Sequence, residues 1–202
     1  MNKGVFLDRD GVLNYPVLNP KTMEYEAPHH KDDFMLFPGV IEALKKLLDL
    51  NYNLFLVSNQ PDFAKGKTTL GNLLSVHKKM DSIFTENKIT FSKYYYCYHH
   101  PQGIIPEYTI NCKCRKPGNL FLKDAKLSFS LDLSDSWMIG DRDVDIYCGQ
   151  SAGTKTIMIK QEYSKDRAGK SNPDYKANSL PEAIETISKF SIKIEGNHNA
   201  TN

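Results

Sequence analysis

The sequence predicts an α/β protein: a Rossmann-like three-layer sandwich with a mostly parallel sheet of five strands or slightly more and helices on both faces. Two observations lead to this fold class. Short apolar runs alternate along the chain with segments whose apolar residues recur at helical spacing. The runs are continuously apolar, as expected for strands buried on both faces. With 202 residues, 40% of them hydrophobic, the chain suits one domain, expected over residues 1–190.

The first half of the chain predicts two strands, each followed by a helix. In both helices the apolar side chains recur every three or four positions, which places them on one helix face. Pro38 and Gly39 suit the start of the first helix, and Thr68 or Thr69 is the N-cap candidate of the second. The expected elements are a strand at 5–7, a helix at 40–51, a strand at 53–58 and a helix at 70–84.

A long segment without helical or strand periodicity, residues 15–37, follows the first strand. It contains three prolines and is expected to be irregular. Irregular loops of this length inside a compact domain are usually functional. We therefore expect this segment to be a lid or substrate loop.

The second half of the chain repeats the alternation of strand and helix. Its three apolar runs are short, and each is followed by a segment with helical spacing. The last residues are polar and are expected to fray. The expected elements are strands at 94–97, 136–140 and 156–159, helices at 120–127, 144–152 and 181–190, and a polar tail at 191–202.

Acidic residues directly follow two of the strands. Asp8 and Asp10 end the first strand, with Gly11 allowing a sharp turn, and Asp141 ends the strand at 136–140. Parallel strands bring such ends together at one edge of the sheet. Buried carboxylates are costly unless they are paired or bind a metal, and three of them form the all-oxygen site that Mg²⁺ accepts. The alternative, an acidic turn at a strand end without a ligand, stays open at this stage.

The same edge offers the groups that phosphoryl transfer requires. Ser58 supplies a hydroxyl, Asn59 and Gln60 supply amides, and Arg115 or Lys116 supplies a cation. A carboxylate can attack phosphorus and form an aspartyl phosphate. A second carboxylate can protonate the leaving oxygen and then take a proton from the attacking water.

A second group of residues predicts a zinc site between 97 and 114. Three cysteines and one histidine form the closed tetrahedral set of a structural zinc centre. They are Cys97, His99, Cys112 and Cys114. His100 is an alternative to His99, and buried thiols or a disulfide are the alternative to zinc. Because Arg115 and Lys116 follow the last thiolate directly, zinc would fix both cations near the substrate.

The strand-end motifs resemble the four motifs of haloacid dehalogenase superfamily phosphatases. The resemblance covers most of residues 5–159, with the motifs in the family's order. The matching stretches are Asp8-Arg9-Asp10-Gly11-Val12, Ser58-Asn59-Gln60, Lys116, and Gly140-Asp141-Arg142-Asp143-Val144-Asp145.

The resemblance assigns a role to each of these positions. It implies Asp8 as the nucleophile, Asp10 as the acid and base, and Ser58 and Lys116 as the groups that stabilise the phosphoryl. It implies Mg²⁺ bound by Asp8, the Asp10 backbone carbonyl and Asp141. Asp145 would then be a supporting acid, and the equally open alternative is an exposed acid in the first turn of a helix.

The cysteine-rich loop resembles the zinc loop of the D-glycero-D-manno-heptose 1,7-bisphosphate 7-phosphatases. This resemblance implies a sugar phosphate substrate, with Arg115 in its recognition. Arg142 stands where those enzymes often carry lysine, and with Asn59 and Gln60 it completes the expected substrate-binding set. Segment 15–37 does not match that family's short substrate loop. Histidinol-phosphate phosphatase, or another small sugar-phosphate phosphatase, is therefore the alternative function.

Composition and charge restrict the remaining possibilities. The net charge of +2 does not favour nucleic acid as a partner, and no apolar run is long enough to span a membrane. We expect a cytoplasmic monomer because no leader-like segment opens the sequence. A non-enzymatic alternative is a zinc-stabilised binding module that has lost catalysis. It is disfavoured because every key position of the motifs is filled.

Overall fold

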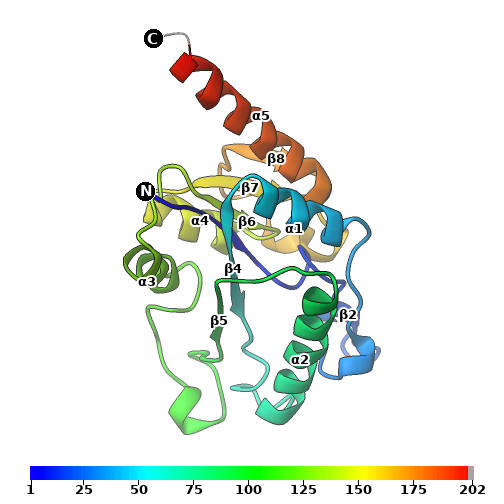
Figure 1. Ribbon diagram of the computed structural model, residues 1–202. Coiled ribbons are helices and arrows are strands. Elements are labelled where there is room, and N and C mark those ends of the chain that lie inside the picture. Colours follow the sequence, from blue (N-terminus) through cyan, green and yellow to red (C-terminus); the bar gives the residue numbers. More distant parts are fainter. Residues whose placement is uncertain (200–202) are drawn as a thin grey trace.

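The computed structural model describes the backbone of residues 1–199 and the side chains of residues 1–191. It contains one six-stranded sheet in which every neighbouring pair of strands is parallel. This confirms the predicted α/β fold class and adds one edge strand (Figure 1). In spatial order the strands are β5 (Lys93–Cys97), β4 (Tyr52–Asn59), β1 (Lys3–Leu7), β6 (Trp137–Gly140), β7 (Lys155–Ile159) and β8 (Tyr175–Ala177).

Helices cover both faces of this sheet. Val5 and Leu7 of β1 pack in one core cluster, whereas Phe6 packs in the other, because successive side chains of a strand point to opposite faces. On the first face the core includes α1 (Val40–Asp49), α2 (Leu70–Glu86) and α5 (Leu180–Asn199). On the second face it includes α3 (Leu120–Phe129) and α4 (Asp143–Ala152).

The strand order places the predicted site residues at one edge of the sheet. β1 lies between β4 and β6, and Leu7 pairs in register with Leu56 on one side and with Ile139 on the other. The residues that follow these positions therefore leave the sheet at the same edge. Asp8, Ser58 and Asp141 are among them.

Three connecting segments, of which 15–37 was predicted to be irregular, contain short ordered elements. Segment 15–37 includes the antiparallel pair β2 (Val17–Leu18) and β3 (Tyr25–Glu26) and the 3₁₀ helix η1 (Lys31–Asp33). The cysteine-rich loop includes η2 (Pro106–Tyr108), and the connection after β7 includes η3 (Glu162–Arg167). Strands of two residues and single 3₁₀ turns are too short to give a periodic signal in the sequence.

The C-terminal helix is longer than predicted. α5 continues to Asn199 instead of ending near residue 190, because residues 191–195 contain no helix breaker and the helix passes through Gly196 as well. The predicted tail is therefore helical as far as it is described, and its last part, 200–202, lies outside the described residues. No described helix combines the length and the apolar stretch that a membrane crossing requires.

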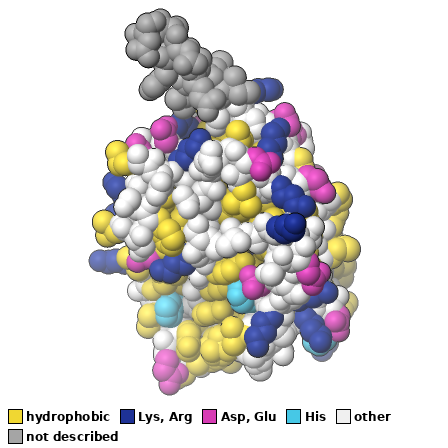
Figure 2. All heavy atoms as spheres, viewed as in Figure 1, with side chains coloured by type: hydrophobic (Ala, Val, Ile, Leu, Met, Phe, Trp, Pro, Cys, Tyr) yellow, Lys and Arg dark blue, Asp and Glu magenta, His cyan; other side chains and the backbone are white. Residues whose placement is uncertain are grey.

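Charged side chains of both signs are interspersed on the face shown in Figure 2. The same face shows an apolar area low on the molecule, in the region of β5 and α2. Tyr94 and Tyr96 of β5 are only partly buried, and both rings pack against His77 of α2. His77 also hydrogen-bonds the Tyr96 hydroxyl at 3.0 Å, so this imidazole lies at the boundary of the core.

Candidate active site

A buried lysine joins the strand-end carboxylate of Asp8 to the carboxylate of Asp145 in the first turn of α4. The Lys116 ammonium lies 2.9 Å from Asp8 Oδ1 and 2.6 Å from Asp145 Oδ1, and it donates a hydrogen bond of 2.7 Å to the Val57 carbonyl. Lys116, Asp8 and Asp145 are all buried. The reading of Asp145 as an exposed acid is therefore wrong. Its carboxylate also accepts a hydrogen bond from the Arg142 backbone, which places it at the start of α4.

Asp141 completes a cluster of three buried carboxylates. One side-chain oxygen each of Asp8, Asp141 and Asp145 lies within 4.8 Å of the other two. A Cβ on Gly11 would lie 2.4 Å from Asp141, so only glycine, here with φ of +89°, lets this carboxylate reach the turn after Asp10. Asp141 Oδ1 accepts no hydrogen bond from a described residue, and the cation nearest to it is the Arg142 guanidinium, whose Nε lies 3.8 Å away.

The pKa values of two members of this cluster, Asp8 and Asp141, are raised because these carboxylates are buried close to other acids. Burial raises the pKa of Asp8, and the opposing charge of Lys116 does not reverse the shift. Burial and the neighbouring charges of Asp145 and Asp8 raise the pKa of Asp141 to about 7, despite the adjacent Arg142. Carboxylates that are costly to ionise without a cation, with one oxygen left unpaired, fit a hard divalent ion such as Mg²⁺.

Asp10 is held apart from this cluster. The Arg9 guanidinium contacts both carboxylate oxygens at 3.1 Å, Gln60 Nε2 donates at 2.7 Å and Asn14 Nδ2 donates at 3.0 Å. Burial alone would raise the pKa of Asp10, but Arg9 and the hydrogen bonds from Asn14 and Gln60 hold it below its usual value. The side chain of Asp10 is therefore a fixed, ionised carboxylate.

Gln60 corrects one predicted role. It was expected to bind substrate, but it is 1% exposed and all of its polar atoms contact protein groups. Its amide nitrogen donates to Asp10 and to Ser58 Oγ, and its carbonyl accepts from Arg9. Gln60 thus lies behind Asp10 and does not line the cavity described below.

Asn59 positions the lysine. Its side-chain oxygen accepts from the Lys116 backbone N–H at 3.0 Å, and its nitrogen donates to the Lys116 carbonyl at 3.1 Å. The end of β4 therefore fixes the peptide that carries Lys116. Asn59 also lines the cavity, so its predicted contact with substrate stays a prediction.

A cavity of about 280 Å³ borders Asp10, Asn59 and Lys116 and is rich in cations, whereas Asp8, Ser58 and Asp141 lie beneath it and are not among its lining residues. The sequence predicted Asp10, Asn59, Arg115, Lys116 and Arg142 at this place. The residues that line it are Asp10, Glu24, Tyr25, Glu26, Ala27, Asn59, Pro61, Asp62, Lys65, Lys67, Arg115, Lys116, Arg142, Val144 and Arg167. Lys65, Lys67 and Arg167 were missed because they belong to a turn and a 3₁₀ helix without a recognisable motif.

Segment 15–37 forms part of the cavity wall, in the place expected for a lid. The segment is attached to the turn after β4 by two contacts. His29 Nε2 lies 2.9 Å from Asp62 Oδ2, and Lys67 forms an ion pair with Glu26. On its other side, the Tyr25 ring packs edge-on against Tyr163 of η3.

The predicted zinc ligands converge on one point. The three Sγ atoms of Cys97, Cys112 and Cys114 are 3.2–3.5 Å apart, and His99 Nδ1 lies 3.5 Å and 3.7 Å from two of them. A tetrahedral zinc ion would place its sulfur ligands ~3.8 Å apart, so the set fits that ion. His100 instead accepts a hydrogen bond from the Gln102 backbone. His99 is therefore the histidine that the fold brings to the thiols.

Comparison with known proteins finds close relatives over most of the chain. A family of HAD-hydrolase-like proteins matches residues 113–183. The D-glycero-beta-D-manno-heptose-1,7-bisphosphate 7-phosphatase of Haemophilus influenzae is 33% identical over 193 residues, which cover 94% of this chain and 100% of the relative. Its counterpart from Yersinia pestis is 32% identical over 185 residues, covering 91% and 94% of the two chains.

Solved structures show the same fold. The D,D-heptose 1,7-bisphosphate phosphatase of B. bronchiseptica, complexed with magnesium and phosphate, superposes with a TM-score of 0.77 at 21% identity. The match covers 93% of this chain and 99% of that one. A putative HAD-like phosphatase from Mesorhizobium loti gives 0.74 at 23% identity, covering 92% and 87%.

Proposed function

The chain belongs to the HAD-like phosphatases, in the family of the D-glycero-beta-D-manno-heptose-1,7-bisphosphate 7-phosphatases, and we propose that it removes the 7-phosphate from such a heptose bisphosphate. The observation that carries the proposal is the buried Lys116. It contacts Asp8 and Asp145, beside an Asp141 oxygen that accepts no hydrogen bond from the described residues. This arrangement opens into a cavity lined by further cations. Such a site suits a phosphate ester.

In the proposed reaction the two carboxylates of the first motif act in turn. Asp8 attacks phosphorus, and the bond to the leaving sugar oxygen breaks as an aspartyl phosphate forms. Before turnover Asp10 must take up a proton from solvent, against the lowered pKa that its contacts impose. It then delivers this proton to the leaving oxygen and later removes one from the water that hydrolyses the intermediate. Arg9, Gln60 and Asn14 hold Asp10 in place during both steps. Ser58 and Lys116 contact the phosphoryl oxygens.

The residues that would hold Mg²⁺ are Asp8, Asp141 and the backbone carbonyl of Asp10. The unpaired Asp141 oxygen and the raised pKa values of the buried carboxylates support this assignment. When bound, Mg²⁺ would neutralise part of the charge on the phosphoryl group. With or without Mg²⁺, the Lys116 ammonium offsets part of the negative charge of Asp8 and Asp145.

Zinc is proposed as a structural ion held by Cys97, His99, Cys112 and Cys114. The close approach of four ligand atoms supports it. Arg115 follows this cluster and donates a hydrogen bond to the His99 carbonyl at 3.4 Å. The cluster would therefore fix Arg115 and Lys116 at the cavity.

The proposed substrate is a small anionic sugar, contacted by Asn59, Arg115 and Arg142 at the cavity wall. We place the enzyme in the cytoplasm, where three neighbouring thiols such as Cys97, Cys112 and Cys114 stay reduced. The monomeric state stays a prediction.

The test compares phosphate release from heptose 1,7-bisphosphate and from histidinol phosphate, with Mg²⁺ present. We expect the bisphosphate to be the better substrate by kcat/KM. Asp8→Asn should abolish turnover, while Asp49→Asn, the same change on an exposed residue at the end of α1, should not. Faster release from histidinol phosphate would refute the substrate. Equal rates for Asp8→Asn and the parent would refute catalysis by this site and favour a binding module.

A further inference from the structure

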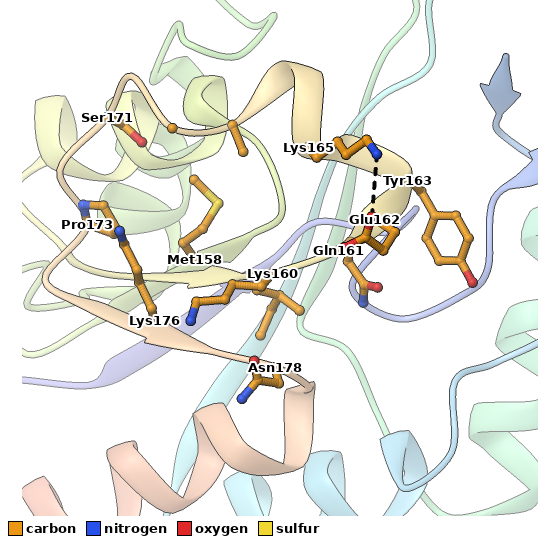
Figure 3. A pocket seen from close by; sticks show the side chains of 13 residues that line it. Met158, Lys160, Gln161, Glu162, Tyr163, Lys165, Ser171, Pro173, Lys176 and Asn178 are labelled. Atoms are coloured by element: carbon orange, nitrogen blue, oxygen red, sulfur yellow. Dashed lines mark ion pairs between the residues drawn. The ribbon is translucent and has the colours of Figure 1, made fainter.

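A second cavity, of about 570 Å³, lies at the C-terminal ends of β7 and β8 (Figure 3). Its volume falls within the range of small-molecule sites. None of its lining residues lines the active-site cavity, and none belongs to the sequence motifs. The two cavities share η3, because Glu162, Tyr163 and Lys165 line the second one and Arg167 lines the first.

The cavity combines an apolar floor with a positively charged rim. Met158 and Ile159, at the end of β7, are 5% and 1% exposed and form part of its apolar lining. Three lysines line it against a single acid, Glu162, which lies 3.6 Å from Lys165. Figure 3 shows the other two, Lys160 and Lys176, on the opposite side of the cavity from Glu162.

Lys160 and Lys176 have no ion-pair partner among the described residues. The nearby Glu182 carboxylate is occupied by Asn178, whose backbone and side-chain nitrogens both donate to it at 2.8 Å. Lys160 and Lys176 lie on the neighbouring ends of β7 and β8, which pair in register through Met158 and Lys176. Two ammonium groups therefore stand beside an apolar floor with no protein anion to bind.

Both walls of the cavity are attached to the Asp141 motif of the active site. In η3, Ser164 is buried and its hydroxyl donates a hydrogen bond of 2.9 Å to the Asp141 carbonyl. The opposite wall, residues 168–171, is held by Asp143, whose carboxylate accepts from the backbone N–H groups of residues 169, 170 and 171 at 2.8–3.2 Å. A molecule bound between these walls would therefore influence the position of the Asp141 backbone and of the Asp143 side chain, both in the Asp141 motif.

We propose that this cavity binds a small organic anion with an apolar body and serves as an effector site. The apolar body would cover Met158 and Ile159, and the negative group would lie between Lys160 and Lys176. Its binding would hold η3 and the 168–171 wall at a fixed separation, and thereby the backbone around Asp141. The binding part does not depend on the proposed function, whereas the effector part rests on it.

Binding is tested with 8-anilinonaphthalene-1-sulfonate, a fluorescent aromatic sulfonate with both required features. We expect saturable binding to the parent and about tenfold weaker binding to Lys160→Gln/Lys176→Gln, which loses two ionic contacts. Ala168→Trp should block the cavity without a change of charge. The control Lys78→Gln/Lys79→Gln removes the same charge from exposed positions on α2 and should bind like the parent.

The effector role is tested with 4-nitrophenyl phosphate as substrate and Mg²⁺ present. We expect the probe to change kcat in the parent, with saturation at the concentrations that saturate fluorescence, and to leave kcat of both cavity variants unchanged. Equal probe binding by the parent and the cavity variants, or displacement of the probe by inorganic phosphate, would overturn the site. Probe binding without any change in kcat would overturn the effector role. A parent inactive on all phosphate esters would instead refute the proposed function and leave the fluorescence result intact.

Discussion

At the scale of single residues, Arg9 is the least expected member of the site. It lies between the two motif carboxylates in the sequence, and its guanidinium is 1% exposed and contacts both oxygens of Asp10. A buried charge pair of this kind contributes little net stability when intact, but the removal of one partner leaves the other charge uncompensated. The folded state therefore requires contact between Arg9 and Asp10, and this contact also orients the Asp10 carboxylate.

We expect Arg9→Met to lower the free energy of unfolding by about 3–5 kcal/mol, because Asp10 would remain buried without its cation. The double variant Arg9→Met/Asp10→Asn should lose about 1–3 kcal/mol less than the sum of the single changes, because it removes both charges. Urea denaturation of the four proteins measures this coupling. Additive losses would show that the contact carries no specific energy.

At the scale of elements, two loops contribute side chains to the cavity, and each loop is held in place by a different set of contacts. Segment 15–37 is attached to the turn after β4 by the His29–Asp62 pair and by the Glu26–Lys67 pair. The cysteine-rich loop instead gathers four ligand atoms at one point. We expect the first set of contacts to depend on pH and the second on the proposed zinc ion.

The Asp62 contact predicts a pH-dependent contribution to stability. Burial alone would raise the pKa of Asp62, but the hydrogen bond from His29 and the charges of Lys67 and Lys65 hold it below its usual value. Since the folded pKa is the lower one, the stabilisation is complete above the unfolded pKa of about 3.9 and is lost as the pH falls through the folded pKa. Asp62→Asn should therefore cost about 1–2 kcal/mol at neutral pH and less at about pH 3, which lies below the unfolded pKa.

Chemical denaturation at the two pH values measures the cost of Asp62→Asn. The control is Asp33→Asn, an exposed position of the same loop, which should be neutral at both. A cost that is equal at both pH values would show that the charge of Asp62 does not stabilise the loop.

The cysteine cluster predicts a dependence of activity on zinc. Cys112→Ser should lose stoichiometric zinc and about tenfold or more in kcat/KM, because Arg115 and Lys116 follow the cluster and small displacements of binding groups are costly. Cys148→Ala, a buried thiol outside the cluster, should keep its zinc. Metal analysis of the purified proteins gives the answer, and well-folded parent without zinc would refute the site.

At the scale of the whole molecule, the sequence was most informative where strands end in carboxylates. Asp8 and Asp141 could be placed together because continuous apolar runs predict parallel strands, and parallel strands share an edge. The expected contact of Gln60 with substrate does not fit its buried place, because its partners Arg9 and Asp10 come from the turn after β1, which no pattern around Gln60 specifies. The roles of Asn14, Ser164 and Arg167 were missed for the same reason: each depends on contacts made after the chain has folded.

The buried acid cluster also predicts that the carboxylates needed to bind Mg²⁺ lower the stability of the metal-free protein. Asp8, Asp141 and Asp145 lie together with two cations, Lys116 and Arg142, so the carboxylates outnumber the cations and their repulsion should strain the metal-free protein. We expect Asp141→Asn to raise the melting temperature in EDTA, whereas Mg²⁺ should stabilise the parent and not the variant. Thermal denaturation with and without Mg²⁺ checks both. A less stable variant in EDTA would show that the three charges are already balanced.

The position of β1 between β4 and β6 has a consequence for synthesis on the ribosome. A nascent chain that has emerged through β5 contains three adjacent strands of the sheet, yet it has neither Lys116 nor the acids that follow β6. At that stage Asp8 follows a strand, β1, that has no partner on the β6 side, and Lys116 is not yet present to contact it. Only when residues 116–145 have left the exit tunnel can β6 insert beside β1 and close the site, so hydrolytic competence arises late in translation and all at once.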